Sequence, residues 1–255
     1  MQVLLTNDDG IEETGLQALH RALSSVADVT VVAPADDQSA VGRSMSSRVA
    51  VDEHELGYAI HGTPADCVVA GLSSLVPETD VVVSGCNRGA NLGQYVLGRS
   101  GTISAAVEAA FFGVPAIAVS MYIPTGEVDY RTFDPGYDEY AEAMRVAEYL
   151  VDRALDRGVF EEADYLNVNV PVADGEPCEM EVTTPSTVYD MGAKRRDGHI
   201  TLVDRIWGRM AEGETTDPVG TDRRAILERR VSVSPLTAAH TARQHDALDA
   251  LAVEF

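Results

Sequence analysis

The stretch VLLTNDDGIEETG, residues 3–15, joins a run of apolar residues to two adjacent acids and a glycine. The apolar run is typical of a short buried strand, and helical leucine spacing starts after the turn, at Leu16. A strand, a turn and a helix in this order predict the first β–α unit of an α/β fold. The adjacent carboxylates of Asp8 and Asp9 repel each other, and burying either one is costly without a partner. The rest of the sequence therefore has to supply that partner.

The β–α pattern repeats along the first part of the chain. Further strand-like apolar runs lie at 28–33, 80–85, 115–121 and 165–170. Helix-like segments alternate with them at 62–75, 102–113 and 138–156. Strands that are apolar throughout and separated by helices indicate a parallel sheet covered on both faces. We therefore predict a Rossmann-like, mostly parallel α/β sheet with helices on both faces.

The pattern changes after Pro171. Residues 1–171 are predicted to form the Rossmann-like catalytic core. Residues 172–230 hold short strand-like pieces, many charges and several Gly and Pro residues, which predicts a β-rich extension. This extension is too charged and broken to form a core alone, so we expect it to act as an oligomerisation arm on a second subunit. Residues 231–255 are expected to return to the core or to the partner subunit.

The charge of the chain limits its partners. The 255 residues carry a net charge of −22, and Lys194 is the sole lysine. Such a surface argues against a nucleic-acid polymer as partner, but a bound cation can reverse the local field for a small anion. Acid excess with almost no lysine is typical of proteins from salt-rich cytoplasm. No run of membrane-spanning length or signal peptide is evident, which predicts a cytoplasmic protein without membrane partners.

Four polar clusters are predicted to share one rim of the sheet. Three of them follow strands, and the fourth opens a helix; they are TNDDG (6–10), PADDQSA (34–40), SGCNRGANLG (84–93) and GRSGT (98–102). In open parallel sheets, ligands bind beyond the carboxyl ends of the strands. We therefore expect the ligand-binding and catalytic residues to lie in these clusters.

The clusters offer oxygen ligands for a cation. Asp8 and Asp9 supply carboxylates, Ser39 a hydroxyl and Asn87 an amide oxygen. This set suits a hard divalent cation such as Mg²⁺ or Mn²⁺. At a turn both acids can converge on one cation, which would offset their repulsion. The alternative is that the acids form an ordinary turn and complement a helix dipole, and that Ser39 and Asn87 are turn residues.

A phosphate site is predicted beside the cation. Ser100, Gly101 and Thr102 open a helix, where free N–H groups and the dipole favour anions. Asn91 and Arg99 are further candidates for substrate binding. Arg99 is either a phosphate clamp or an exposed or paired arginine.

Several motifs together resemble the SurE family of survival proteins, which are metal-dependent nucleotide phosphatases. The motifs are LLTNDDGI, APADDQSA, HGTPADCV, VVSGCNRGANLG, RSGTISAAVEAAFFGVPAIAVS, LNVNVP, GTD and VSVSPL. The resemblance implies hydrolysis of nucleoside 5′- or 3′-monophosphates, homodimers or homotetramers, and one divalent cation per subunit. It also implies metal ligands at Asp8, Asp9, Ser39 and Asn87. Family members commonly have acids where Gln94 and Tyr95 stand and an aromatic residue at Arg99, so substrate preference can differ here.

The predicted reaction is metal-assisted hydrolysis of a phosphomonoester, as in a 5′-nucleotidase or an acid-phosphatase-like enzyme. Asn87 and the start of the 102–113 helix would hold phosphate oxygens in the transition state. Asp8 or Asp9 would orient the attacking water, or Asp8 would attack directly. Two alternatives are a nucleotide-binding regulator without turnover and a metal-dependent nucleotide-sugar transferase.

Overall fold

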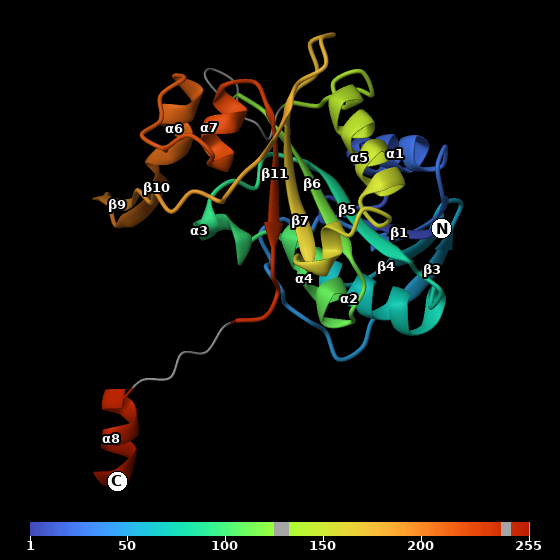
Figure 1. Ribbon diagram of the computed structural model, residues 1–255, viewed down its shortest axis with the longest axis horizontal. Helices are drawn as coiled ribbons and strands as arrows, with labels where there is room; N and C mark the ends of the chain where they lie inside the picture. Colours follow the sequence, from blue (N-terminus) through green and yellow to red (C-terminus); the bar gives the residue numbers. More distant parts are fainter. Residues whose placement is uncertain (125–132, 241–245, 255) are drawn as a thin grey trace.

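The computed structural model describes residues 1–124, 133–240 and 246–254, and a large twisted sheet runs through its centre (Figure 1). Its strands are β1 (Gln2–Thr6), β2 (Asp28–Pro34), β3 (Val51–His54), β4 (Gly57–Ile60), β5 (Val81–Arg88), β6 (Ala116–Tyr122), β7 (Tyr165–Pro171), β8 (Met180–Val182) and β11 (Val231–Leu236). The order of the nine described strands is β3-β4-β2-β1-β5-β6-β7-β11-β8. The five strands predicted from apolar runs pair in parallel, as β2-β1-β5-β6-β7. The predicted Rossmann-like sheet is thus confirmed.

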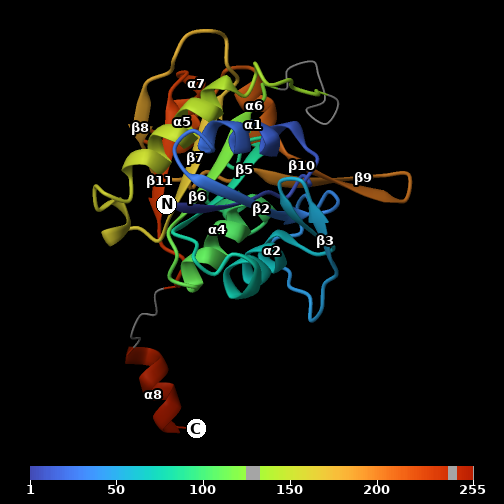
Figure 2. The same cartoon turned by 90° about the vertical axis from the view of Figure 1, so that its right-hand side faces the viewer.

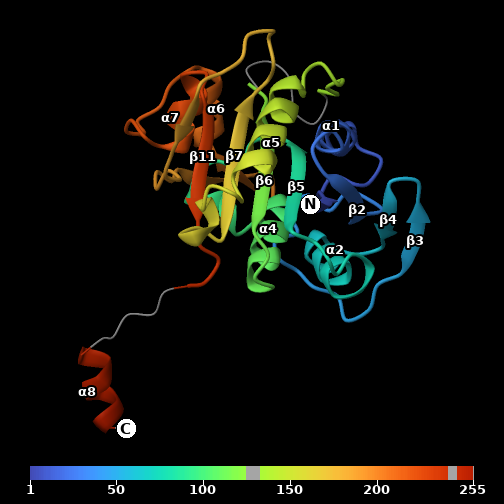
Figure 3. The same cartoon turned by 45° about the vertical axis from the view of Figure 1, so that its right-hand side comes forward.

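Helices cover both faces of the sheet (Figure 3). They are α1 (Thr14–Leu23), α2 (Pro64–Ala70), α4 (Gly101–Phe111) and α5 (Ala141–Arg153), with a π-helical turn at Gly71–Leu75 and a 3₁₀ turn at Val159–Glu161. The short helix α3 (Gln94–Leu97) follows β5 and contains no buried residue. Helices α1 and α5 enclose one apolar core with the sheet, and α2 and α4 enclose the other. Thr63 caps α2, because its hydroxyl accepts the Asp66 N–H while the Asp66 carboxylate accepts the Thr63 N–H.

The hairpin of β3 and β4 is not among the strands that the sequence predicts. The two strands pair antiparallel, and β4 continues the sheet parallel to β2. Strand β3 is mostly exposed and charged, so it lacks the apolar run that marks a buried strand. Gly57 has φ +146°, and a Cβ atom there would lie 2.2 Å from the Val31 carbonyl oxygen, so this close approach requires glycine.

The region 172–230 mixes strands with helices. Besides β8 it contains the antiparallel hairpin β9 (Met191–Arg196) and β10 (His199–Asp204), which projects from the body in Figure 2. Two helices were not predicted, α6 (Arg205–Ala211) and α7 (Asp222–Leu227). The Asp204 side chain caps α6 by accepting the Ile206 N–H at 3.0 Å. Ile206 and Met210, one helical turn apart, pack with Leu92 and Ile226 in a third apolar cluster.

The C-terminal part returns to the sheet through β11. This strand is antiparallel to β7 and parallel to β8. The last described element, α8 (Asp246–Glu254), lies apart from the sheet in Figures 1 to 3. No described helix combines the length and apolarity needed to cross a membrane.

The strand order places a switch point beside β1. The chain leaves β1 for β2 on one side and later returns to its other side with β5. In open α/β sheets, loops that leave neighbouring strands in opposite directions open a crevice at their carboxyl ends, and ligands bind there. The turn with Asp8 and Asp9 follows β1, and Asn87 lies near the carboxyl end of β5. The predicted site residues thus lie at the switch point.

Candidate active site at the switch point of the sheet

The turn after β1 is closed by Asn7, whose side chain is fully buried. Its Nδ2 donates to the Gly10 carbonyl at 2.7 Å, and its Oδ1 accepts the Gly10 N–H at 3.3 Å. Gly10 has φ +122°, a conformation that other residues rarely adopt. The chain therefore leaves the extended conformation at residue 7, and the two acids no longer alternate between the faces of a strand.

Asp8 lies against the start of α4. Its side chain is 4% exposed, and the Thr102 Oγ1 donates to its Oδ1 at 2.7 Å. A Cβ atom at Gly101 would lie 2.6 Å from the Asp8 Cβ, so glycine is needed at this contact. The first and fourth polar clusters therefore meet, as the sequence predicts.

Asp9 is less buried than Asp8 but still largely enclosed by the protein, and it faces the end of β5. The Arg88 backbone N–H donates to the Asp9 Oδ2 at 3.1 Å. Beside this contact, the Asn87 Nδ2 donates to the Gly89 carbonyl at 2.6 Å, which turns the Asn87 Oδ1 in the opposite direction. The first and third clusters therefore meet as well.

The loop after β2 completes the site. The Gln38 N–H donates to the Asp8 carbonyl at 2.7 Å, which places Ser39 next to the acid turn. The Ser39 hydroxyl donates to the Asp37 Oδ1 at 2.6 Å, so its lone pairs remain available to a ligand. Asp37 was not predicted as a site residue, although it belongs to the polar cluster PADDQSA that follows β2. It holds Ser39, and its charge adds to the negative potential at Asp8.

The acid pair is not neutralised by protein cations. Burial raises the pKa of Asp8 above its usual range, against the hydrogen bonds from Thr102. Burial and the charge of Asp8 raise the pKa of Asp9 to about 7. Among the described residues, no Lys, Arg or His side-chain nitrogen lies within 4.0 Å of either carboxylate. The charge of Arg88 lowers the pKa of Asp9, but this effect is smaller than those of burial and of Asp8. Two buried acids with neutral oxygen donors beside them fit a hard divalent cation.

The candidate ligand set contains only two acids, Asp8 and Asp9, and this limits the choice of metal. The described part of the chain contains no group of three or more His, Cys, Asp or Glu side chains able to hold a metal ion. The ligand set would therefore depend on neutral oxygens, those of Ser39 and Asn87. Such a set disfavours Zn²⁺, which prefers nitrogen and sulfur, and favours Mg²⁺ or Mn²⁺.

The remaining predicted residues are mostly engaged within the protein. Ser100 caps α4 by accepting the Ile103 N–H at 3.1 Å, and its own hydroxyl proton remains a donor. Asn91 is buried, with its Nδ2 donating to the Ser120 Oγ at 2.8 Å and its backbone N–H to Asn169. Asn91 thus anchors the glycine-rich loop. Arg99 is exposed, and its guanidinium lies over the Tyr95 ring.

A buried network behind the glycine-rich loop has no counterpart in the sequence prediction. The fully buried Asp222 accepts the Gly93 N–H at 2.6 Å and the Ser186 N–H at 2.9 Å. The Gln94 N–H donates to the Ser186 carbonyl at 2.8 Å. Arg223, the residue after Asp222, is also buried, and its side chain donates to the Val188 carbonyl at 2.9 Å. The motif GTD contains Asp222, but its spacing does not reveal a partner 129 residues away.

Comparison with known proteins settles the family. A model of the family "Survival protein SurE" matches residues 3–191. The chain belongs to the SurE family. The 5′-nucleotidase SurE of Haloarcula marismortui is 61% identical over 254 residues, covering 99% of this chain and 94% of that protein. That of Natronomonas pharaonis is 60% identical over 256 residues, covering 100% of both. The crystal structure of the SurE protein from Aquifex aeolicus matches with TM-score 0.80 and 30% identity, covering 100% of this chain and 99% of that one.

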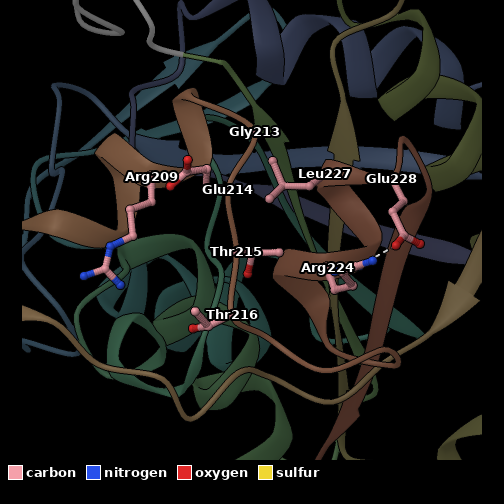
Figure 4. A pocket seen from close by; sticks show the side chains of 8 residues that line it. All are labelled: Arg209, Gly213, Glu214, Thr215, Thr216, Arg224, Leu227 and Glu228. Atoms are coloured by element: carbon pink, nitrogen blue, oxygen red, sulfur yellow. Dashed lines mark hydrogen bonds and ion pairs between the residues drawn. The ribbon is translucent and has the colours of Figure 1, made fainter.

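The two hollows found elsewhere in this SurE chain do not contain the predicted site. One, of about 570 Å³, lies at α6 and α7 and is lined by Arg209, Gly213, Glu214, Thr215, Thr216, Arg224, Leu227 and Glu228 (Figure 4). Its arginines are neutralised, Arg224 by Glu228 and Arg209 by Asp190. The other, of about 470 Å³, is lined by residues from 138–145 and 173–177. Neither offers an unpaired cation to a phosphate.

The raised pKa of Asp9 predicts a pH dependence of stability for the metal-free SurE chain. Because the pKa in the folded state lies above the ordinary value of 3.8, this group favours folding at low pH. Its contribution is lost as the pH rises through about 7. We therefore compare the fall in melting temperature between about pH 5 and about pH 8, in excess chelator. This fall should be smaller for Asp9→Asn than for the unsubstituted chain. Equal losses in both would contradict the raised pKa.

The acidic surface predicts a salt dependence. The two relatives named above come from halophilic archaea, in agreement with the expectation of a salt-rich cytoplasm. At 1 M salt the screening length is about 3 Å, so repulsion among the carboxylates of a chain with net charge −22 is largely removed. The thermal midpoint should therefore rise from dilute buffer to molar KCl. If the melting temperature does not change with KCl, the acid excess is not an adaptation to salt.

Proposed function

We propose that this chain releases phosphate from nucleoside 5′-monophosphates at the Asp8–Asp9 pair. The predicted 5′-nucleotidase activity itself is confirmed by full-length relatives of that name at about 60% identity. They do not favour the two alternatives, a regulator without turnover and a nucleotide-sugar transferase. We choose this site because the carboxylates of Asp8 and Asp9 lie buried at the switch point of the sheet without an ion-pair partner among the described residues.

The family is generally metal-dependent, and we assign the cation to Asp8, Asp9, Ser39 and Asn87. One Mg²⁺ or Mn²⁺ per subunit suits this set of oxygens. When bound, such a cation neutralises phosphate charge and lowers the pKa of a water molecule.

The protein groups around the pair have distinct roles. Thr102 and the start of α4 fix the Asp8 carboxylate, and the Arg88 N–H orients that of Asp9. Asp9 is the more accessible of the two, so it is better placed to orient an attacking water molecule. Direct attack by Asp8 is the second possibility, and the burial of Asp8 disfavours it.

Phosphate binding is assigned to groups that retain a free donor. The Ser100 hydroxyl and the backbone N–H of Gly101 lie at the positive end of α4, next to Asp8. Charge developing on the phosphate oxygens would be stabilised there without reorganisation. Asn91 and Thr102 contribute by positioning the loop and Asp8, respectively. A 3′-phosphate remains an alternative substrate.

We also propose that the chain forms a homodimer or homotetramer in the cytoplasm, through the region 172–230. Ile200 and Leu202 on the projecting hairpin are 64% and 72% exposed. Two neighbouring apolar side chains on a projecting strand support a contact with a second copy.

Removal of divalent cations tests the proposed function. Excess chelator should abolish phosphate release from adenosine 5′-monophosphate, and Mg²⁺ or Mn²⁺ should restore it, because the acids alone repel the substrate. Circular dichroism should show that the metal-free chain is still folded. Full activity in chelator, with metal absence verified by elemental analysis, would contradict the cation assignment.

A further inference from the structure

Three side chains form a partly exposed stack beside the acid pair. The Arg99 Cζ lies 3.9 Å from the centroid of the Tyr95 ring. The Tyr189 ring meets that of Tyr95 edge to face, with centroids 4.6 Å apart. Tyr189 is 58% exposed, and Arg99 is exposed as well. We call these three residues the Arg99–Tyr95–Tyr189 stack.

The stack is held from behind by the buried network. Just before Tyr95, the Gln94 N–H donates to the Ser186 carbonyl. Just before Tyr189, the Val188 carbonyl accepts from Arg223 and the Val188 N–H donates to the Ser186 Oγ at 3.1 Å. Both aromatic residues are therefore fixed to one scaffold, although they are far apart in the chain. A fixed exposed ring loses little conformational entropy when a ligand stacks on it.

The stack adjoins the proposed phosphate site. Arg99 directly precedes Ser100 and Gly101, and Gly101 contacts Asp8. The Arg99 carbonyl also accepts the Gly42 N–H at 3.1 Å, which ties it to the loop of Ser39. Two residues of extended chain span at most about 7 Å, so a nucleotide with its phosphate at α4 can reach the stack with its other end.

The chemistry of the stack suits a nucleobase. A guanidinium is planar and weakly hydrated, and it stacks on aromatic faces. Among the described residues, the contact given for the Arg99 guanidinium is the one with the Tyr95 ring. Exposed aromatic rings bind bases through stacking, whatever the base, because every base has a π-face.

We propose that the Arg99–Tyr95–Tyr189 stack is the nucleobase subsite of this chain. The inference rests on the proposed function, since it assumes that the phosphate lies at α4. In this proposal Arg99 binds the nucleobase and not the phosphate.

Kinetics with and without a base test the subsite. The substrates are adenosine 5′-monophosphate and ribose 5-phosphate, which lacks the base. Tyr189→Leu and Arg99→Lys should each lower kcat/KM for the nucleotide by about tenfold, mainly through KM, and leave ribose 5-phosphate unchanged. Tyr189→Phe should retain the activity. Tyr149→Leu is the matched control, because Tyr149 is exposed beneath Arg153 on α5, away from this loop.

The outcomes separate this inference from the proposed function. Equal losses on both substrates in Arg99→Lys would make Arg99 a phosphate ligand and overturn the subsite. Calorimetric binding of adenosine 5′-monophosphate does not depend on turnover. Weaker binding to Tyr189→Leu at unchanged thermal stability would support the subsite even if phosphate release failed; unchanged binding would overturn it.

Discussion

Asp9→Asn and Asp8→Asn are each expected to lower the turnover of nucleoside monophosphates by about 10²–10³-fold while the fold is kept. Either substitution preserves the shape of the side chain but removes a charge that the proposed cation requires. In excess chelator, both variants should melt at a higher temperature than the unsubstituted chain. The reason is that each relieves the repulsion between two buried carboxylates.

Asp36→Asn is the matched control for this pair of substitutions. Asp36 is exposed in the neighbouring loop and has no assigned role, so its removal should leave turnover near normal. The alternative interpretation, acids that only complement a helix dipole, gives the opposite pattern. It predicts near-normal turnover in Asp8→Asn and Asp9→Asn, with a small stability loss of about 0.3–1 kcal/mol.

Asp222→Ala is expected to destabilise the chain by about 3–5 kcal/mol, the effect of breaking a buried charged network. The substitution leaves the Gly93 and Ser186 N–H groups without their acceptor and removes the carboxylate beside Arg223. Urea unfolding measures this loss. Since the network holds the loop that carries Asn87, turnover of the folded variant should fall as well.

Val219→Ala is the control for Asp222→Ala. Val219 lies three residues away and is 76% exposed, so its truncation should leave stability near that of the unsubstituted chain. A loss in Asp222→Ala no larger than that of this surface variant would mean that the network does not hold the loop.

The location of the site was predictable because it follows from the topology of the sheet. Apolar runs identified the parallel strands, and parallel strands bring their carboxyl ends to one rim. Contacts of Asp8 with Thr102 and of Asp9 with Arg88 confirm that the polar clusters meet there. Thr63 as the cap of α2 was predictable for a similar reason, since a cap depends on neighbouring residues alone.

Features that depend on distant partners were not predictable. The sequence does not reveal that Asn91 is turned toward Ser120, or that Thr102 bonds to Asp8 rather than to a ligand. The bond between Asp222 and Gly93 joins segments 129 residues apart. Helix α6 is short, and its burial depends on Leu92 from another part of the chain. Neither local propensity nor periodicity contains such information.

Titration of the metal-free chain with Mn²⁺ by calorimetry tests the central claim most directly, because it needs no substrate or turnover. The account predicts one Mn²⁺ per chain, with binding lost or strongly weakened in both Asp8→Asn and Asp9→Asn and kept in Asp36→Asn. Unchanged stoichiometry and affinity in Asp8→Asn and Asp9→Asn would contradict the assignment of the cation to this pair.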